Sequence, residues 1–135
     1  MGLLRKISPT SVLRLSLGFS YLYSGFDLAM HPTGWYWAIR PLPEFIQTVI
    51  NSVGTDNFLR TQGVVELAIA FALLAWFLPK GFVRLASLLV TLQMISILIF
   101  VGLSLDTFRD VVILGAGFSL FLTTLDPLIQ LRIKK

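Results

Sequence analysis

The stretch LAIAFALLAWFL at residues 67–78 and, after a short basic turn, the stretch FVRLASLLVTLQMISILIFVGLS at residues 82–104 decide the fold of this chain. The first has no charged residue, and the second has only Arg84. A helix of about 20 apolar residues crosses a hydrocarbon core about 30 Å thick and satisfies its own backbone hydrogen bonds there. We therefore expect both stretches to belong to membrane-spanning helices.

The composition of the whole chain points the same way. Its 135 residues are 56% hydrophobic and 13% charged, and the mean hydropathy is +0.82. A soluble domain of this length lacks the interior volume to bury so much apolar surface. We expect one integral membrane domain over residues 1–135, with the lipid bilayer as its solvent and a multi-pass location in a cell membrane.

Charge and cysteine content exclude several classes of function. The net charge of +4 and the isoelectric point near 9.9 come from scattered basic residues, without the stripe or recognition helix typical of a nucleic-acid-binding protein. The chain has no cysteine and one histidine, His31. We therefore expect no disulfide, no metal site, no intrinsic cofactor and no nucleic-acid partner.

Helix start and stop residues predict an all-α membrane four-helix bundle. Ser8 and Pro9 are typical of a helix start, Pro32 and Pro79 end the first two runs, and the fourth run stops before Asp126. No small-residue cleavage pattern follows the N-terminal segment, so we expect the first span to be retained. The expected spans are residues 9–30, 58–78, 82–104 and 108–125.

The segment between the first two spans, residues 31–57, is too polar to cross a bilayer but contains a further helical pattern. Between Pro43 and Gly54 one helical face collects the apolar residues Phe45, Ile46, Val49, Ile50 and Val53. Such a helix lies along a membrane surface or folds over the bundle. We expect a long outer loop that contains a short interfacial helix.

Lysine and arginine near the ends of the spans predict the orientation, because cytoplasmic loops carry the excess of positive charge. With both termini in the cytoplasm, that side holds Arg5, Lys6, Lys80, Arg84, Arg132, Lys134 and Lys135, and Arg14 by extension of its side chain. The opposite side holds Arg40, Arg60 and Arg109. We therefore expect cytoplasmic termini, with the loop at 31–57 and the turn at 105–107 outside.

Two carboxylates stand inside the expected spans. Asp27 lies about one turn from the outer end of the first span and shares a helical face with Ser24 and His31. Glu66 lies on the order of 14 Å into the second span, on one face with Gln62. A charge at the bilayer centre costs about 2.5–3.5 kcal/mol on insertion scales, so both carboxylates should face the bundle interior and find donors there.

The sequence leaves two roles open for these carboxylates. They bind a ligand or carry protons, which makes Asp27 and Glu66 the candidate catalytic residues, or they only join helices through hydrogen bonds. Whether each is paired or protonated also stays open. Side chains that can donate to them are Tyr21, Tyr23, His31, Arg40, Arg60, Gln62 and Arg109.

Three aromatic residues, Trp35, Tyr36 and Trp37, follow the first span directly. Tryptophan and tyrosine gather at lipid headgroups, so an aromatic belt is one interpretation. A stacking wall for a quinone ring is the other.

The stretches LRLSLGFSYLYSGFDL at residues 13–28 and QGVVELAIAFALL at residues 62–74 resemble the DoxX/DoxD-like family of small four-helix membrane proteins. The likeness covers most of the chain and rests on Arg14, Gly18, Gly25, Gly63 and Glu66. Many members carry a lysine where this chain has Asp27. Some members are membrane subunits of thiosulfate:quinone oxidoreductases, so the resemblance implies a link to quinone and to small sulfur oxyanions.

Two functional classes follow. In the first, the chain is the membrane subunit of a redox complex similar to thiosulfate:quinone oxidoreductase, in which Glu66 or Asp27 carries protons for a quinone. A small oxyanion would be attracted by Arg40, Arg60 and Arg109, and the expected ligand-binding group is completed by His31, Gln62 and Tyr23. In the second, the chain is a non-catalytic scaffold or accessory subunit that docks other membrane subunits or a copy of itself. Whether the chain is itself an enzyme stays open, because it offers no electron carrier besides the quinone.

Overall fold

The computed structural model describes residues 8–125, and this part of the chain is helical without a strand. Its elements are α1 (Pro9–Met30), the 3-10 helix η2 (Pro32–Trp35), α2 (Tyr36–Ile39), α3 (Glu44–Val53), α4 (Thr55–Leu74), α5 (Lys80–Phe100) and α6 (Phe108–Thr124). Two of them, α4 and α5, are long and apolar enough to cross a membrane. The all-helical prediction is thus confirmed for the described residues.

Helix α1 begins and ends where its prolines predict. Pro9 is its first residue, and the backbone carbonyl of Ser8 accepts the Val12 N–H at 3.1 Å. The Ser8 side chain makes no capping bond. The helix ends at Met30, two residues before Pro32.

The short helix predicted between the first two spans is present as α3, and it leads directly into α4. Gly54 separates the two helices with a φ of 91°, a left-handed conformation that favours glycine. This single-residue joint lets α4 begin at Thr55, three residues before the expected start at Phe58. Ile50 of α3 is buried.

Helix α4 ends at Leu74, whereas its span was predicted to continue to Leu78. Ala75 is extended, although residues 75–78 are as apolar as the helix before them. Arg14 of α1 gives the physical reason. Its guanidinium donates to the carbonyl oxygens of Leu73 at 3.0 Å and Ala75 at 3.2 Å, and a longer helix would use the Leu73 carbonyl for its own hydrogen bond. The sequence predicted only that Arg14 extends to the inner surface.

Helix α5 begins at Lys80, because Pro79 serves as its N-cap, and ends at Phe100 instead of Ser104. Beyond it, Gly102 has a φ of 83° and the Thr107 hydroxyl donates to the Gly102 carbonyl at 2.7 Å. These contacts form a compact turn into α6, which matches its expected span of 108–125 within one residue. The predicted stop at Asp126 and Pro127 lies outside the described residues.

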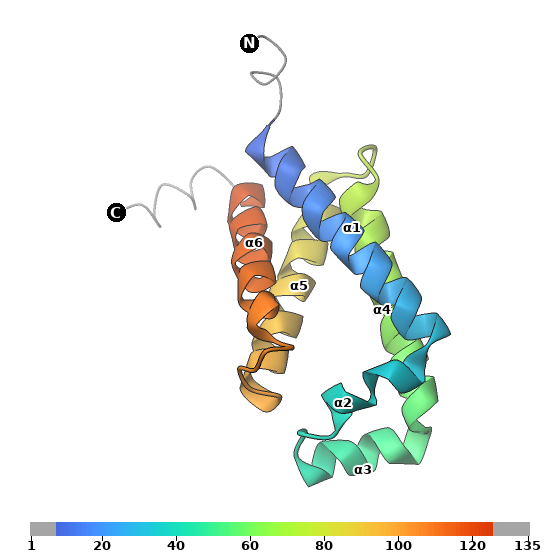
Figure 1. Cartoon of the computed structure of the whole chain (residues 1–135). Coiled ribbons are helices and arrows are strands. Elements are labelled where there is room, and N and C mark those ends of the chain that lie inside the picture. Colours follow the sequence, from blue (N-terminus) through green and yellow to red (C-terminus); the bar gives the residue numbers. More distant parts are fainter. Residues whose placement is uncertain (1–7, 126–135) are drawn as a thin grey trace.

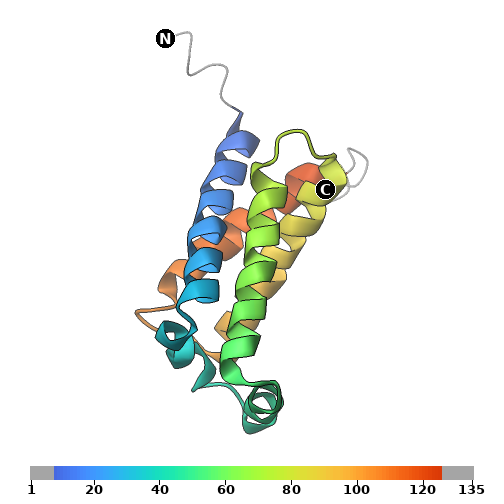
Figure 2. The same ribbon diagram turned by 90° about the vertical axis from the view of Figure 1, so that its right-hand side faces the viewer.

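The four long helices pack as two pairs. α1 lies along α4, α5 lies along α6, and the pairs meet through α4 with α5 and α1 with α6. In Figure 1 the pairs diverge toward the end where α2 and α3 lie, and Figure 2 shows the same helices from the side. The apolar core fills the other end and the middle of the molecule with Leu17, Tyr21, Ile69, Ala70, Leu73, Val83, Ala86, Val90, Met94 and Leu120.

The backbones of α1 and α4 touch at Gly25 and Gly63. A Cβ on Gly25 would lie 2.9 Å from the carbonyl oxygen of Gly63, and a Cβ on Gly63 would lie 2.7 Å from the backbone nitrogen of Ala29. Only glycine fits such an approach, as in the small-residue contacts of membrane helices. This contact fixes the height at which Glu66, one turn further along α4, faces α1.

Candidate functional site

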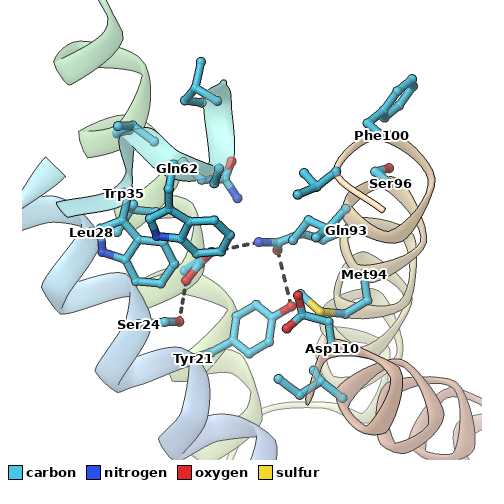
Figure 3. A pocket seen from close by; sticks show the side chains of 18 of the residues that line it. Tyr21, Ser24, Leu28, Trp35, Gln62, Gln93, Met94, Ser96, Phe100 and Asp110 are labelled. Atoms are coloured by element: carbon cyan, nitrogen blue, oxygen red, sulfur yellow. Dashed lines mark hydrogen bonds between the residues drawn. The ribbon is translucent and has the colours of Figure 1, made fainter. Parts of the chain in front are cut away.

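A cavity of about 610 Å³ opens between the diverging helix pairs. Its wall comes from α1, α4, α5, α6 and the segment of η2 and α2, with Ile46 of α3 at one edge. Figure 3 shows its lining side chains. The polar or ionisable members are Ser20, Tyr21, Tyr23, Ser24, Asp27, Gln62, Glu66, Gln93, Ser96, Arg109 and Asp110, together with the indoles of Trp35 and Trp37.

Glu66 is buried in the cavity wall, with 7% of its surface exposed. Ser24 Oγ donates to Glu66 Oε2 at 2.5 Å, and Gln93 Nε2 donates to Glu66 Oε1 at 2.7 Å (Figure 3). The expectation that Glu66 faces the interior is confirmed. The donors are two neutral side chains from α1 and α5, not the arginines or other donors that the sequence suggested.

Tyr21 extends the hydrogen-bond chain across the cavity. Its hydroxyl donates to Gln93 Oε1 at 3.3 Å, which fixes the Gln93 amide so that its nitrogen points to Glu66. This series of hydrogen bonds therefore runs from Tyr21 of α1 through Gln93 of α5 to Glu66 of α4. It joins the two helix pairs above the apolar core.

Asp27 lies at the cavity rim with 41% of its side chain exposed, so it faces the interior less completely than expected. Its Oδ1 contacts His31 Nδ1 at 3.1 Å, and its Oδ2 accepts the indole N–H of Trp35 at 2.9 Å. His31 is one of the expected partners, whereas Trp35 was not predicted. The carboxylate therefore ties both the N-cap and the last residue of η2 back onto α1.

The three arginines that were predicted to attract one anion are spread over different sites. Arg109 lines the cavity. Arg60 donates to the backbone carbonyl of Ala29 at 2.9 Å on an exposed surface, and neither Arg60 nor Arg40 lines the cavity.

Of the other predicted ligand-binding residues, two line the cavity and one does not. Gln62 and Tyr23 line the cavity, although Tyr23 is 80% exposed. His31 is outside the lining and reaches the site only through Asp27. The cavity therefore brings together Asp27, Glu66, Gln62, Tyr23 and Arg109 and leaves out His31, Arg40 and Arg60.

The aromatic segment after α1 forms part of the cavity wall. The rings of Trp35 and Trp37 stack with centroids 6.2 Å apart and planes 26° apart, and both line the cavity. Between them, the Tyr36 hydroxyl donates to Asp56 Oδ1 at 2.5 Å, which ties α2 to the start of α4. The Asp56 carboxylate raises the pKa of Tyr36 above its usual value of 10.

Gln93, Ser24 and Asp110 are the site residues that sequence reasoning missed or left without a role. Gln93 interrupts an apolar run and Asp110 stands at the start of one, and a polar residue in an apolar helix usually faces another polar group. That signal identifies them as interior residues. It does not identify their partners, because the rotation of each helix about its axis is set by packing.

Among the described residues no three histidine, aspartate or glutamate side chains are placed to hold a metal ion. Comparisons with protein-family models, curated proteins and solved structures found no match for this chain. The resemblance to the DoxX/DoxD-like family therefore stays a prediction.

Proposed function

We propose that the protein is a multi-pass cell-membrane protein built as a four-helix bundle, with α1, α4, α5 and α6 as its spans. Support comes from the large apolar side chains that these helices expose outward, among them Phe19, Phe26, Val64, Phe71, Leu85, Leu92, Val112 and Phe118. Only 33% of the apolar window of α4, and the same share in α5, is buried. A helix in the core of a soluble protein would be mostly buried, whereas lipid covers such surfaces in a membrane.

The proposed orientation has both termini in the cytoplasm and the cavity in the outer half of the membrane. Lys80 and Arg84 lie at the end of the molecule away from the cavity, while Arg40, Arg60 and Arg109 lie toward the cavity end. Of the other basic residues used for this prediction, Arg14 is bonded to the end of α4, and the rest lie outside the described residues: Arg5, Lys6, Arg132, Lys134 and Lys135.

Because the chain has no cysteine, single-cysteine variants test this orientation directly. Thr48→Cys in α3 and Gly81→Cys at the start of α5 are both at exposed positions. In intact cells, a membrane-impermeant maleimide should label the first variant and leave the second unlabelled until the cells are opened. The reverse pattern would refute the orientation.

Within this topology, we propose that the chain is the membrane subunit of a redox complex whose outer cavity receives a quinone ring. The observation that carries the proposal is the cavity itself, in which the stacked Trp35 and Trp37 rings form a flat wall and Glu66 stands in a hydrogen-bond chain. A flat wall fits an aromatic ring, and a carboxyl group beside it can exchange the protons that accompany quinone redox chemistry. The resemblance to the DoxX/DoxD-like family supplies the link to quinone, whereas of the three arginines expected to attract a small oxyanion only Arg109 lines the cavity.

Tryptophan fluorescence tests ligand binding. In a Trp76→Phe background the indoles of Trp35 and Trp37 are the remaining reporters, because the chain has three tryptophans. Decylubiquinone added to this protein in lipid nanodiscs should quench the fluorescence saturably. Quenching that rises linearly, as for ring partitioning into lipid alone, would exclude a quinone site in the cavity.

The role of Glu66 in turnover has its own test. With its native partner, the purified protein should reduce decylubiquinone in a thiosulfate-dependent way, and Glu66→Gln should abolish this activity. Unchanged turnover in Glu66→Gln would remove Glu66 from the mechanism.

A second candidate, the non-catalytic accessory subunit, is favoured by one observation. Both carboxylate oxygens of Glu66 are hydrogen-bonded, and among the described residues no fully buried side-chain nitrogen or oxygen lacks a partner. Such a network can serve helix packing alone. Purification from native membranes separates the two: a stoichiometric, cofactor-bearing partner without copurified quinone supports the accessory role.

A further inference from the structure

Asp110 is a buried carboxylate that the proposed function has not used. It is the third residue of α6, 9% of its surface is exposed, and it lines the cavity. Its side chain has no hydrogen bond or ion pair within residues 8–125. In Figure 3 its carboxylate lies among the cavity side chains, next to the Tyr21 hydroxyl and Met94. Because no fully buried side-chain oxygen within residues 8–125 lacks a partner, the unbonded Asp110 oxygens are accessible from the cavity, and a donor for them has room there.

The neutral donors nearest to Asp110 are directed elsewhere, and Arg109, its neighbour in the chain, makes no ion pair with it. The hydroxyl of Tyr21 has one hydrogen, which goes to Gln93, and the Gln93 amide nitrogen donates to Glu66. Ser24 also donates to Glu66. The donor groups of this network therefore converge on Glu66 and leave Asp110 as a free acceptor on the opposite wall.

The charge on the cavity wall also disfavours a ligand that brings more acceptor atoms. Three carboxyl groups line the cavity, from Asp27, Glu66 and Asp110, against the single guanidinium of Arg109. Electrostatic repulsion is stronger in a site shielded from water. A neutral ring with hydrogen-bond donors fits this wall. A ring that presents only carbonyl oxygens places one of them next to the Asp110 carboxylate, which repels it.

We infer that the cavity prefers the reduced, hydroquinone form of its ring ligand, with one ring hydroxyl donating to the Asp110 carboxylate. The inference rests on the proposed quinone site and specifies its redox form. The oxidised ring has no O–H group, so it cannot make this hydrogen bond. Asp110 is then a ligand-binding residue on the wall opposite Glu66.

The test compares two redox forms of one probe. Decylubiquinol and decylubiquinone are titrated anaerobically into the Trp76→Phe protein in nanodiscs, with fluorescence and calorimetry as readouts. The hydroquinone should bind at least tenfold more tightly. By linkage, a tenfold preference raises the two-electron midpoint potential of the bound ring by about 30 mV.

Three variants connect the preference to Asp110. Asp110→Leu removes both the acceptor and the repulsion of a carbonyl oxygen, so it should weaken hydroquinone binding at least tenfold while leaving quinone binding equal or tighter. Asp110→Asn keeps the shape and adds an amide donor, so both forms should bind with nearly equal affinity. Asp106→Asn, at an exposed position in the turn before α6, is the matched control and should behave as the parent.

The possible results of these titrations distinguish failure of the hydroquinone preference from failure of the proposed quinone site. If neither redox form binds, the quinone site itself is refuted. Equal binding of both forms in the parent protein overturns the hydroquinone preference and leaves the quinone site intact. Tighter binding of the quinone that Asp110→Leu abolishes also overturns it, because Asp110 would then be a protonated donor. Melting temperatures of all variants within a few degrees of the parent value exclude misfolding as the cause.

Discussion

The α1–α4 pair and the α5–α6 pair share a joining device at one end. Arg14 of α1 donates to the carbonyls of Leu73 and Ala75 at the end of α4. Arg84 of α5 donates through Nε at 3.2 Å and Nη2 at 2.5 Å to the Thr124 carbonyl at the end of α6. In both pairs an arginine near the start of one helix thus closes the C-terminus of its partner, where the carbonyl groups attract positive charge.

Along their length the pairs differ. Gly25 and Gly63 bring the backbones of α1 and α4 together, whereas Gly117 of α6 faces only side chains of α5, the nearest being Val90. Backbone atoms cannot move aside, but a valine side chain can. We therefore expect the wall that holds Glu66 to be the more rigid one, and the wall across the cavity, with Gln93 and Asp110, to adjust more readily to a ligand.

The largest expected effect comes from adding a methyl group at each glycine contact. Gly63→Ala puts its Cβ against the backbone of α1 and should destabilise the protein by about 3 kcal/mol, at the upper end of overpacking effects. Gly117→Ala should cost about 1 kcal/mol, because Val90 can shift. Thermal unfolding in nanodiscs, followed by circular dichroism, measures both.

The control for these substitutions is Gly115→Ala in α6. A Cβ at Gly115 would meet nothing within 4 Å, so alanine should stabilise the helix by about 0.5–1 kcal/mol. Equal losses for Gly63→Ala and Gly117→Ala would show that the two pairs are equally rigid.

The second prediction concerns polar groups that join helices, compared with those that stay within one. Glu66→Leu leaves the Ser24 hydroxyl and the Gln93 amide without their acceptor and should cost about 2 kcal/mol. Thr91→Val in α5 removes a bond to the Ser87 carbonyl of the same helix and should cost under about 1 kcal/mol. Chemical unfolding in mixed micelles measures the difference, and a costlier Thr91→Val would contradict this assignment.

The third prediction tests the arginine caps that the two helix pairs share. Arg14→Met and Arg84→Met keep much of the apolar stem and remove the guanidinium, so each should cost about 1 kcal/mol. Hydrogen exchange should rise at the C-terminal turn of α4 in the first variant and of α6 in the second. Exchange that rises in the helix carrying the mutation, and not in its partner, would refute the capping role.

The smallest expected effect concerns the segment that connects α1 to α4. It contains a hydrogen bond between two titratable side chains, Tyr36 and Asp56, and the turn between α5 and α6 has no such bond. The Asp56 carboxylate accepts the Tyr36 hydroxyl and raises the pKa of Tyr36 above 10. The neutral tyrosine is the form that the fold favours, so this stabilisation is complete below pH 10 and is lost as the pH rises through the elevated pKa.

Tyrosinate absorbance measures this shift. The component that disappears in Tyr36→Phe should titrate above pH 10 in the parent protein and move down toward pH 10 in Asp56→Asn. A Tyr36 midpoint that Asp56→Asn leaves unchanged would show that the hydrogen bond is absent in solution.

Residues with strong local effects made much of the fold predictable. Pro9 and Pro32 act within their own helix turn, so α1 appears with the expected bounds, 9–30. The end of α4 was wrong by four residues because its cause is Arg14, on another helix. A sequence pattern read one segment at a time does not contain that contact.

In the candidate site, too, features that depend on a residue's own position were predictable and contacts between helices were not. Burial of Glu66 could be predicted from the cost of a charge in lipid, which depends only on depth. Its partners Ser24 and Gln93 depend on the rotation and height of three helices, and the Gly25–Gly63 contact sets part of that geometry. For this reason, none of the seven candidate donors bonds to Glu66, although the position of the carboxylate was right.

The two arginine caps have a consequence for biosynthesis. Arg14 reaches carbonyl groups 59 and 61 residues later in the chain, whereas Arg84 reaches one 40 residues later. In the proposed membrane topology, the Arg14 guanidinium of α1 therefore lacks its carbonyl acceptors until α4 has been synthesised, and we expect the insertion machinery to hold α1 until then. Photocrosslinking of stalled nascent chains tests this: α1 should contact the translocon when α4 is still inside the ribosome, and α4 once that helix has emerged.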